Sequence, residues 1–329
     1  MFALGTFAGP QGTFVGLVME ERIFPLPSAH APWRGFGARD DFPEAGSLLG
    51  LLEDWDANFP RLEKLARFAS GALGDLPEVD PVTLRYLPPV LRPGKILHSA
   101  ANYREHVVEM AAYNAAVGNV EPNARFAGDK ANAKPYLFLK AASALTGPFD
   151  DIPLPEGEHQ IDWEAELAVV IGRRGRRIAA ARAMDHVAGF MVANDVTCRD
   201  LLWREDRKNF KTDWLSSKSH DGFEPIGPVF VPRRYVADPG HLRIRLKLNG
   251  VTKQDGSTGD MIFSAEEQIE FASRLMTLEP GDLFVTGTVG GVGQATGEFL
   301  AAGDVMETEV VGVGKLKNRI VAAPGEGSV

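Results

Sequence analysis

Short apolar runs separated by polar turns dominate the chain from residue 136 onward, and this pattern predicts a structure made mostly of strands. The runs that have the length and spacing of strands are YLFLK (136–140), residues 159–172, HVAGFMVAND (186–195), IGPVFV (226–231), LRIRLKLNG (242–250), DLFVTGT (282–288) and VMETEVVGVG (305–314). Helical spacing interrupts them near 197–206 and at 264–276, where Ser264 and Glu267 form a capping box. Many strands with few helices predict an α+β, largely antiparallel architecture.

The first 90 residues have a different pattern. Residues 1–27 alternate around a Gly-Pro-Gln-Gly turn and predict a hairpin, and leucines at near-helical spacing between 48 and 68 predict helices. The segment YLPPVLRPG (86–94) is rich in proline and has the composition of a linker. We therefore expect a small N-terminal domain over 1–90 and a second domain over 91–329. The second begins with a strand (95–101), a helix (102–113) and a long polar loop (113–135), and loops of that length are usually functional or disordered.

The stretch HQIDWEAELAVVIG (159–172) carries three acids at alternate positions, Asp162, Glu164 and Glu166. Side chains alternate faces along a strand, so the three carboxylates share one side and repel each other. Either water screens them on an exposed edge, or a cation lies among them. Spacing alone favours the exposed edge, because Glu-x-Glu is frequent in strands.

Composition excludes several classes of protein. The chain has 329 residues, 44% of them hydrophobic and 24% charged, with a net charge of −9 and a pI near 5.4, which argues against nucleic-acid binding. The basic cluster at 173–177 contains a glycine and is typical of a solvated turn. We find no signal peptide and no apolar run long enough to span a membrane, so we expect a cytoplasmic protein. Cys198 is the only cysteine, which excludes intrachain disulfides and thiolate metal clusters.

A third carboxylate, Asp195, ends the apolar run 186–195, where a buried strand meets its loop. The side chains of Glu164 and Glu166 can converge on one ion, and Asp195 from a neighbouring strand would complete a set of oxygen ligands. Mg²⁺ and similar hard cations prefer such ligands. A solvated acidic face explains the same residues.

His106 and Glu109 lie three residues apart on the helix predicted at 102–113 and share a face, which suits a general base but also an ordinary surface pair. Lys218 precedes a Gly-Pro turn and could hold a carboxylate or an enolate oxygen, although most such lysines are solvated. The glycine loop at 286–293 matches no nucleotide-binding pattern, and neither a G-x-S-x-G elbow nor an H-E-x-x-H pair occurs.

Seven motifs in one order resemble the fumarylacetoacetate hydrolase superfamily, in particular its acylpyruvase-like branch. They are NYxxHxxEM, FLKxxSxLTGPxDxIxLP, DxExELAVVIG, ANDVTxRD, SKSxDGFxPIGP, QDGxTxDMIF and LxPGDxxxTGTxxGVG, and they run from about residue 93 to 320. The resemblance implies a mixed, mainly antiparallel β-roll preceded by a small α+β domain, usually assembled as a homodimer.

The resemblance also implies the site and its chemistry. A Mg²⁺ or Mn²⁺ ion would be held by Glu164, Glu166 and Asp195. Catalysis would fall to His106, Glu109 and Lys218, and substrate contacts to Tyr103, Arg199 and Thr288. Asp162 gains no ligand role from it and is expected to support the ligands or face solvent.

The implied activity is hydrolysis of a C–C bond in a 2,4-diketo acid, such as an acylpyruvate or fumarylpyruvate, through a metal-stabilised enolate. Decarboxylation of oxaloacetate and isomerisation or dehydration of 2-oxo acids use the same enolate and stay open as alternatives, as does a metal-binding protein without turnover. The chain departs from the family pattern at Leu202, where relatives often have glutamine, and at Ala141, Ala142 and Val289. A less polar or differently shaped substrate tail is one hypothesis for this difference.

Overall fold

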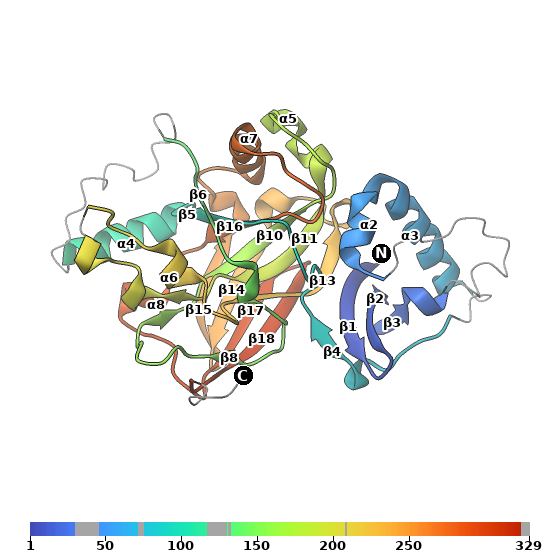
Figure 1. Ribbon diagram of the computed structural model, residues 1–329, viewed down its shortest axis with the longest axis horizontal. Helices are drawn as coiled ribbons and strands as arrows, with labels where there is room; N and C mark the ends of the chain where they lie inside the picture. Colours follow the sequence, from blue (N-terminus) through green and yellow to red (C-terminus); the bar gives the residue numbers. More distant parts are fainter. Residues whose placement is uncertain (30–45, 72–75, 117–129, 131–132, 208, 324–329) are drawn as a thin grey trace.

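Figure 1 shows the computed structural model of the chain, which describes residues 1–29, 46–71, 76–116, 130, 133–207 and 209–323. The strands and helices formed by the first 71 residues lie together at one end of the long axis. Strand β4 (Arg85–Leu87) lies beside them, most of the remaining strands and helices form the larger lobe, and strand β13 lies between the two groups.

The largest sheet has the strand order β3-β2-β1-β13-β11-β10-β16-β5-β6, with β4 paired to β1 and β7 paired to β13. Most of its neighbours are antiparallel, whereas β5 with β16 and β7 with β13 are parallel. The strands are β1 (Ala3–Gly9), β2 (Gly12–Met19), β3 (Arg22–Pro25), β4 (Arg85–Leu87), β5 (Ile96–Ala100), β6 (Tyr136–Leu139), β7 (Leu145–Thr146), β10 (Ala165–Ile171), β11 (Val187–Asn194), β13 (Glu224–Pro232) and β16 (Leu283–Thr288).

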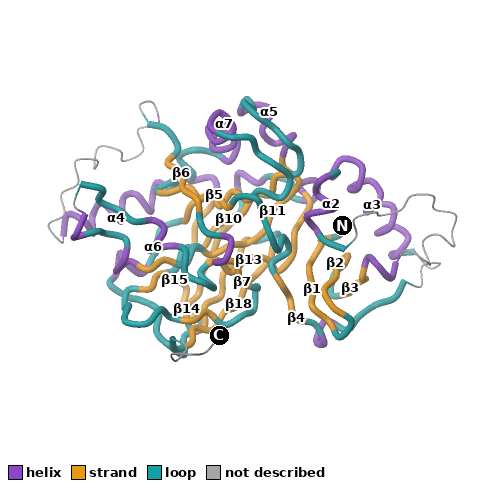
Figure 2. The backbone as a smooth tube through the Cα atoms, in the orientation of Figure 1, coloured by secondary structure: helices purple, strands orange, loops and turns teal. Residues whose placement is uncertain are grey.

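A second sheet, in the order β15-β14-β17-β18-β8, packs against the first, and a short ladder joins β12 to β9 (Figure 2). These strands are β8 (Ile152–Pro153), β9 (Ile161–Asp162), β12 (Thr197–Cys198), β14 (Arg243–Leu248), β15 (Val251–Ser257), β17 (Val305–Val310) and β18 (Gly314–Val321). The predicted fold class, α+β with a mixed and mainly antiparallel sheet, is confirmed.

Helices lie at the periphery of the sheets in both lobes (Figure 2). They are α2 (Leu48–Glu53), α3 (Trp55–Ser70), α4 (Arg104–Ala116), α5 (Ala180–Ala183), α6 (Trp214–Lys218), α7 (Ala265–Leu275) and α8 (Gly293–Thr296). The predicted capping box of α7 is present: the Ser264 backbone N–H donates to Glu267 over 2.9 Å. Across the described ranges, no helix has both the length and the apolar character that a membrane span requires.

Strand β10 separates two hydrophobic cores. Its odd-numbered residues, from Ala165 to Ile171, belong to the core shared with the second sheet, which contains Leu246, Met306 and Leu316. Ala168 and Val170, on the opposite face, belong to the core shared with helices α2 and α3. Because both faces are covered, every residue of β10 is buried. A charged carboxylate on this strand is therefore destabilising unless cations or hydrogen-bond donors replace the water that it loses.

The N-terminal lobe continues the main sheet. The predicted hairpin at 1–27 is a three-stranded unit, and β1 pairs with β13 through Leu4 and Phe230. The predicted linker at 86–94 begins inside β4, whose Tyr86 pairs with Phe7 of β1. The apolar core around α2 and α3 contains residues from both sides of position 90. The division of the chain into domains at that position stays a prediction.

Two local predictions were wrong. The helix expected near 197–206 is replaced by strand β12 and short 3₁₀ turns, because Thr197 and Cys198 pair with Asp162 and Ile161. The start of the loop expected from 113 is helical, since α4 continues to Ala116; residues 117–129 and 131–132 lie outside the described part of the chain.

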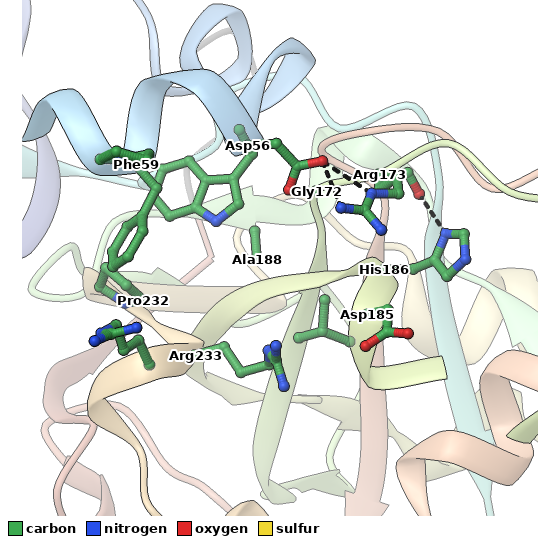
Figure 3. Close-up of a pocket in the computed structure, with 13 residues that line it drawn as sticks. Asp56, Phe59, Gly172, Arg173, Asp185, His186, Ala188, Pro232 and Arg233 are labelled. Carbon is green, nitrogen blue, oxygen red and sulfur yellow. Dashed lines mark hydrogen bonds and ion pairs between the residues drawn. The ribbon is translucent and has the colours of Figure 1, made fainter. Parts of the chain in front are cut away.

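A cavity of about 380 Å³ lies where α3 meets the larger lobe, and we call it the α3 cavity (Figure 3). Asp56 and Phe59 of α3 line one side of it, and Arg173, His186 and Arg233 line the other. Two hydrogen bonds from the Arg173 guanidinium reach Asp56 Oδ2, at 2.9 and 2.6 Å. The lobes therefore meet here through a solvent-accessible ion pair.

Candidate metal and active site

Pairing of β10 with β11 brings the three predicted metal-ligating carboxylates together. The register places Ala165 opposite Asn194, and the Asp195 backbone N–H donates to Glu164 O over 2.9 Å. One carboxylate oxygen from each of Glu164, Glu166 and Asp195 lies within 4.8 Å of the others, and all three residues are buried. The exposed-edge interpretation of these acids is therefore wrong.

The strand predicted through 159–172 is interrupted at Trp163 and Glu164, between β9 and β10. The Glu164 backbone N–H donates to the Asn194 side chain over 3.0 Å, and the Ala165 N–H donates to the Gln254 side chain over 2.9 Å. Side-chain amides thus replace ladder hydrogen bonds at the start of β10.

Two cations hold Glu164. Lys218 Nζ lies 2.7 Å from Glu164 Oε2 and 2.6 Å from Asp195 Oδ2. Arg199 Nη2 lies 2.6 Å from Glu164 Oε1 and 2.8 Å from Asp162 Oδ2. Lys218 therefore lies beside the predicted ligands, and its role toward a substrate stays a prediction. Arg199 Nε and Nη2 are bonded to carboxylates of the protein.

Asp162 contacts Arg199, which in turn contacts Glu164. It is completely buried, and it accepts hydrogen bonds from the backbone N–H groups of Gly293 and Gln294, at 2.6 and 3.0 Å, and from Arg199. Of the two expectations for this residue, the solvent-facing one is excluded.

Three further residues complete the arrangement and were not among the predicted site residues: His98, Lys140 and Glu224. Lys140 Nζ lies 2.7 Å from Asp195 Oδ1 and 2.9 Å from Glu224 Oε2. The His98 ring nitrogens lie 3.2 Å from Asp195 and 3.4 Å from Glu224. The available sequence signal was a histidine and a glutamate inside otherwise apolar strands, β5 and β13.

Together these residues form what we call the buried charge cluster. Its eight charged members are the carboxylates of Asp162, Glu164, Glu166, Asp195 and Glu224 and the cations Lys140, Arg199 and Lys218. Five carboxylates therefore share three cationic side chains, and the His98 ring lies between two of these carboxylates. Because the carboxylates outnumber the cationic side chains, a divalent cation among them would be stabilised.

The excess negative charge is concentrated on Glu166. Burial, and then the neighbouring carboxylates of Asp195 and Glu164, raise the pKa of Glu166 well above its ordinary value. In the described part of the chain Glu166 has no ion-pair partner, and its Oε2 accepts a 2.5 Å hydrogen bond from the Gly287 N–H. By contrast, although burial alone would raise it, Lys140 and Lys218 hold the pKa of Asp195 well below its usual range.

This donor set fits Mg²⁺ or Mn²⁺. All three groups are carboxylate oxygens, the preferred ligands of hard divalent cations, and Glu166 forms no ion pair within the described ranges. A second group of ligand type, His98, Asp195 and Glu224, also converges. In each group a lysine ammonium lies within 2.9 Å of two carboxylates, Lys140 in this one and Lys218 in the first. The first group differs in Glu166, a third carboxylate that forms no ion pair with any described residue.

His106 and Glu109 form the expected pair on α4. His106 Nδ1 lies 2.9 Å from Glu109 Oε1, and Glu109 Oε2 accepts from the Gly291 N–H over 2.8 Å. Because a carboxylate only accepts, Nδ1 must carry the proton, which leaves the lone pair on Nε2. His106 is buried and lines the cavity described next, so its imidazole is oriented as a base.

A cavity of about 540 Å³ opens onto the charge cluster, and we call it the site cavity. The predicted site residues that line it are His106, Glu164, Asp195, Arg199, Lys218 and Thr288. Thr288 Oγ1 donates to Ala165 O and accepts from Gln254, which fixes it at the rim of β10. Ser99, whose buried hydroxyl has no hydrogen-bond partner among the described residues, also lines it.

Tyr103 lies elsewhere. It is fully buried, burial raises its pKa, and it is not among the residues that line the site cavity. Leu202 does not line it either. Neither the expected substrate contact of Tyr103 nor the hypothesis about Leu202 gains support from this geometry.

Comparison with known proteins identifies relatives of this site and fold. The sequence model of the family described as "Fumarylacetoacetate (FAA) hydrolase C-terminal" matches residues 95–321. A mitochondrial oxaloacetate tautomerase of Bos taurus is 40% identical over 277 residues, which are 84% of this chain and 80% of that protein. A mitochondrial oxaloacetate tautomerase of Homo sapiens is 38% identical over the same shares.

Two solved structures superpose on nearly the whole of this chain. A fumarylacetoacetate hydrolase of Exiguobacterium antarcticum superposes with a TM-score of 0.74 at 29% identity, covering 98% of this chain and 100% of that one. A maleylpyruvate hydrolase of Sphingobium, in complex with manganese(II) and pyruvate, gives a TM-score of 0.70 at 26% identity with the same coverage.

Proposed function

Because the chain belongs to the fumarylacetoacetate hydrolase family, we propose that it is a divalent-metal-dependent enzyme that interconverts the keto and enol forms of a 2-oxo acid. The observation that carries this proposal is the convergence of the buried carboxylates of Glu164, Glu166 and Asp195 beside a cavity that the oriented imidazole of His106 also lines. The names of the mammalian relatives, oxaloacetate tautomerases, support this type of reaction.

Glu164, Glu166 and Asp195 would hold the ion, either Mg²⁺ or Mn²⁺. The manganese and pyruvate of the Sphingobium structure support the choice of a divalent ion and of a 2-oxo acid head group. When bound, the ion would supply a Lewis acid for the carboxylate and keto oxygens of the substrate.

The chain's own residues carry the proton transfer. His106 Nε2 removes a proton from the carbon next to the keto group, and the imidazolium that forms gives this proton to the keto oxygen, so that the atoms balance between the two tautomers. Glu109 holds the ring through Nδ1 and stabilises the imidazolium that forms. Lys218, beside the ligand carboxylates, and Thr288, at the rim of the cavity, would keep the oxygens of the head group in place.

Hydrolysis of a C–C bond in a 2,4-diketo acid is a second candidate function. The His106–Glu109 pair favours it, since an imidazole held by a carboxylate also suits the activation of water. Decarboxylation of oxaloacetate would need the same head-group contacts without the base. The expected homodimer and the expected cytoplasmic location stay predictions.

Exchange of the hydrogens next to the keto group with deuterium, followed by NMR, tests the proposal. We expect rapid exchange in oxaloacetate with Mg²⁺ or Mn²⁺ and none above background with EDTA. His106→Ala should slow exchange by about 10²- to 10⁴-fold while calorimetry shows unchanged metal binding. His186→Ala, a histidine of the α3 cavity, is the matched control and should behave as wild type.

The outcomes separate the candidates. Exchange that persists in EDTA would contradict the metal-dependent proposal. Release of pyruvate from acetylpyruvate, lost in His106→Ala, would favour hydrolysis over tautomerisation.

A further inference from the structure

Lys134 is a cationic side chain of the site cavity that the proposed reaction does not use. It lines the cavity together with two other cations, Arg199 and Lys218. Each of these two is ion-paired with two buried carboxylates. Lys134, by contrast, is exposed and forms no ion pair with any residue that the structure describes. Within the described part of the chain, its charge therefore has no partner.

The outer end of the site cavity is formed by Lys134. Strand β6 has a lysine on each side of it, Lys134 two residues before its start and Lys140 directly after its end. The Lys140 ammonium is 2.7 Å from Asp195 Oδ1 in the charge cluster, and Lys140 is only 4% exposed. Between the two lysines, Phe138 and Tyr136 line the cavity at alternate positions, and Tyr136 is already 55% exposed. Exposure thus increases along this wall from the cluster to Lys134.

The cavity between the cluster and Lys134 has room for a short dicarboxylate. Lys218 Nζ, which contacts Glu164 and Asp195, lies 5.7 Å from the Phe138 ring centroid, so this ring lies next to the place proposed for the head group. At the ~30 Å³ that one water occupies in the liquid, the nine non-hydrogen atoms of oxaloacetate need on the order of 270 Å³. The site cavity holds about 540 Å³. A 2-oxo acid held by its head group at the cluster therefore has room to extend along β6 in the direction of Lys134.

A second carboxylate on the substrate needs a cation in this cavity. The carboxylates of Glu164 and Asp195 line it as well, and the protein has a net charge of −9, so a dianion is repelled unless positive charge lies near its tail. Arg199 and Lys218 already donate to carboxylates of the protein. The Lys134 ammonium has three N–H donors and no acceptor among the described residues. A carboxylate is an acceptor that such an ammonium binds strongly, so Lys134 fits the second carboxylate.

We infer that Lys134 binds the second carboxylate of a 2-oxo dicarboxylate and that it makes the site prefer such acids to 2-oxo monocarboxylates of the same length. Oxaloacetate belongs to the preferred class. The inference rests on the proposed function for the position of the head group. It concerns the tail, because Lys134 takes no part in the proton transfer.

Calorimetric titration of the Mn²⁺-loaded protein with 2-oxoglutarate and 2-oxovalerate tests the inference, because these two acids have the same carbon chain and differ in the second carboxylate alone. We expect 2-oxoglutarate to bind at least about threefold more tightly, the scale of one solvent-accessible ion pair. Lys134→Met removes the charge and should abolish this advantage, whereas Lys134→Arg keeps the charge and should retain it. Pyruvate, which has no second carboxylate, should bind wild type and both variants within about twofold.

Deuterium exchange in oxaloacetate gives a second readout. A contact that is made equally in the ground state and the transition state changes KM and not kcat when it is lost. Lys134→Met should therefore raise KM for oxaloacetate at least about threefold and leave kcat within about twofold, whereas damage to the fold would lower kcat as well.

Lys247→Met is the matched control, because Lys247 is also exposed, forms no ion pair with a described residue and does not line the cavity. It should behave as wild type in both measurements. No advantage of 2-oxoglutarate in wild type, or an advantage that survives in Lys134→Met, would overturn the inference and, with pyruvate still binding, leave the proposed function standing. Failure of pyruvate and of both longer acids to bind the Mn²⁺-loaded protein would contradict the proposed function, and the inference with it.

Discussion

The site cavity and the α3 cavity both contain arginines close to carboxylates, yet the two differ in what surrounds the charges. In the α3 cavity, Arg173 and Asp56 keep 47% and 64% of their side-chain surface exposed. In the site cavity, Lys218, Glu164 and Asp195 each keep 9% or less. The ion pair of the α3 cavity is therefore exposed to water, whereas the ion pairs of the site cavity are enclosed by protein.

This difference decides what the charges can do. An exposed ion pair is worth roughly 0–1 kcal/mol, because water competes for both groups. A buried charge must be paired or it costs several kcal/mol. Burial makes the excess of carboxylates in the cluster unfavourable unless a cation binds there, so the cluster can hold an ion strongly. Water screens the arginines of the α3 cavity, so their charges create no comparable demand for a bound ion.

Removal of Lys140 should produce the largest effect. Lys140→Met leaves Asp195 and Glu224 without their shared ammonium, and we expect a loss of about 3–5 kcal/mol in the free energy of unfolding. Chemical denaturation measures it. Lys134→Met is the matched control, since Lys134 lines the same cavity but is exposed, and it should change stability by less than about 0.5 kcal/mol. A small loss of unfolding free energy in Lys140→Met would show that water reaches the cluster and that its charges do not differ from those of the α3 cavity.

Glu166 should make stability depend on pH and metal together. Its folded-state pKa lies above the ordinary value of 4.5, so the metal-free folded protein binds more protons than the unfolded chain between those two pKa values. Stability therefore falls as pH rises through that window and stays lowered above it. Glutamine does not ionise, so Glu166→Gln lacks the pH dependence of stability that the Glu166 carboxyl contributes. Without metal, this variant should be more stable than wild type at high pH, and the difference in stability should vanish near pH 4.5.

Bound metal should make wild type more stable than Glu166→Gln, the reverse of the order without metal. An ion at 100 times its Kd stabilises wild type by about 2.7 kcal/mol, whereas Glu166→Gln loses a ligand and should gain less. Thermal unfolding across pH, with EDTA and with Mn²⁺, gives both comparisons. Parallel pH curves for the two proteins would show that Glu166 ionises normally and that the cluster does not lack positive charge.

Local sequence pattern grouped the candidate residues that depend on one or two neighbouring segments, but it did not decide their role, since spacing alone favoured an exposed acidic edge. Alternation put Glu164 and Glu166 on one side of the chain, although the strand is interrupted at Glu164. The apolar run before Asp195 placed it at a strand end, and helical spacing joined His106 to Glu109. Most strands and the capping box of α7 also followed from periodicity.

What the pattern missed depends on contacts between distant segments. His98 and Lys140 reach Asp195 because β5 lies parallel to β16 and antiparallel to β6, pairings between strands far apart in the chain. The break before β10 requires Asn194 and Gln254 to take backbone hydrogen bonds, which alternation cannot reveal. The order of motifs in the family resemblance supplied some long-range information of this kind, but not these residues.

The smallest expected effect lies in the α3 cavity, and it completes the comparison. Arg173→Ala and Asp56→Ala should each change the free energy of unfolding by less than about 1 kcal/mol, and a double-mutant cycle should give a coupling of roughly 0.2–1 kcal/mol. Because the pair is exposed, this coupling should shrink as salt shortens the screening length below its ~8 Å at physiological ionic strength. Deuterium exchange in oxaloacetate should be unchanged in both variants. A coupling above about 2 kcal/mol, or one insensitive to salt, would mean that the lobes shield this pair from water and that the two cavities differ less than their exposed fractions indicate.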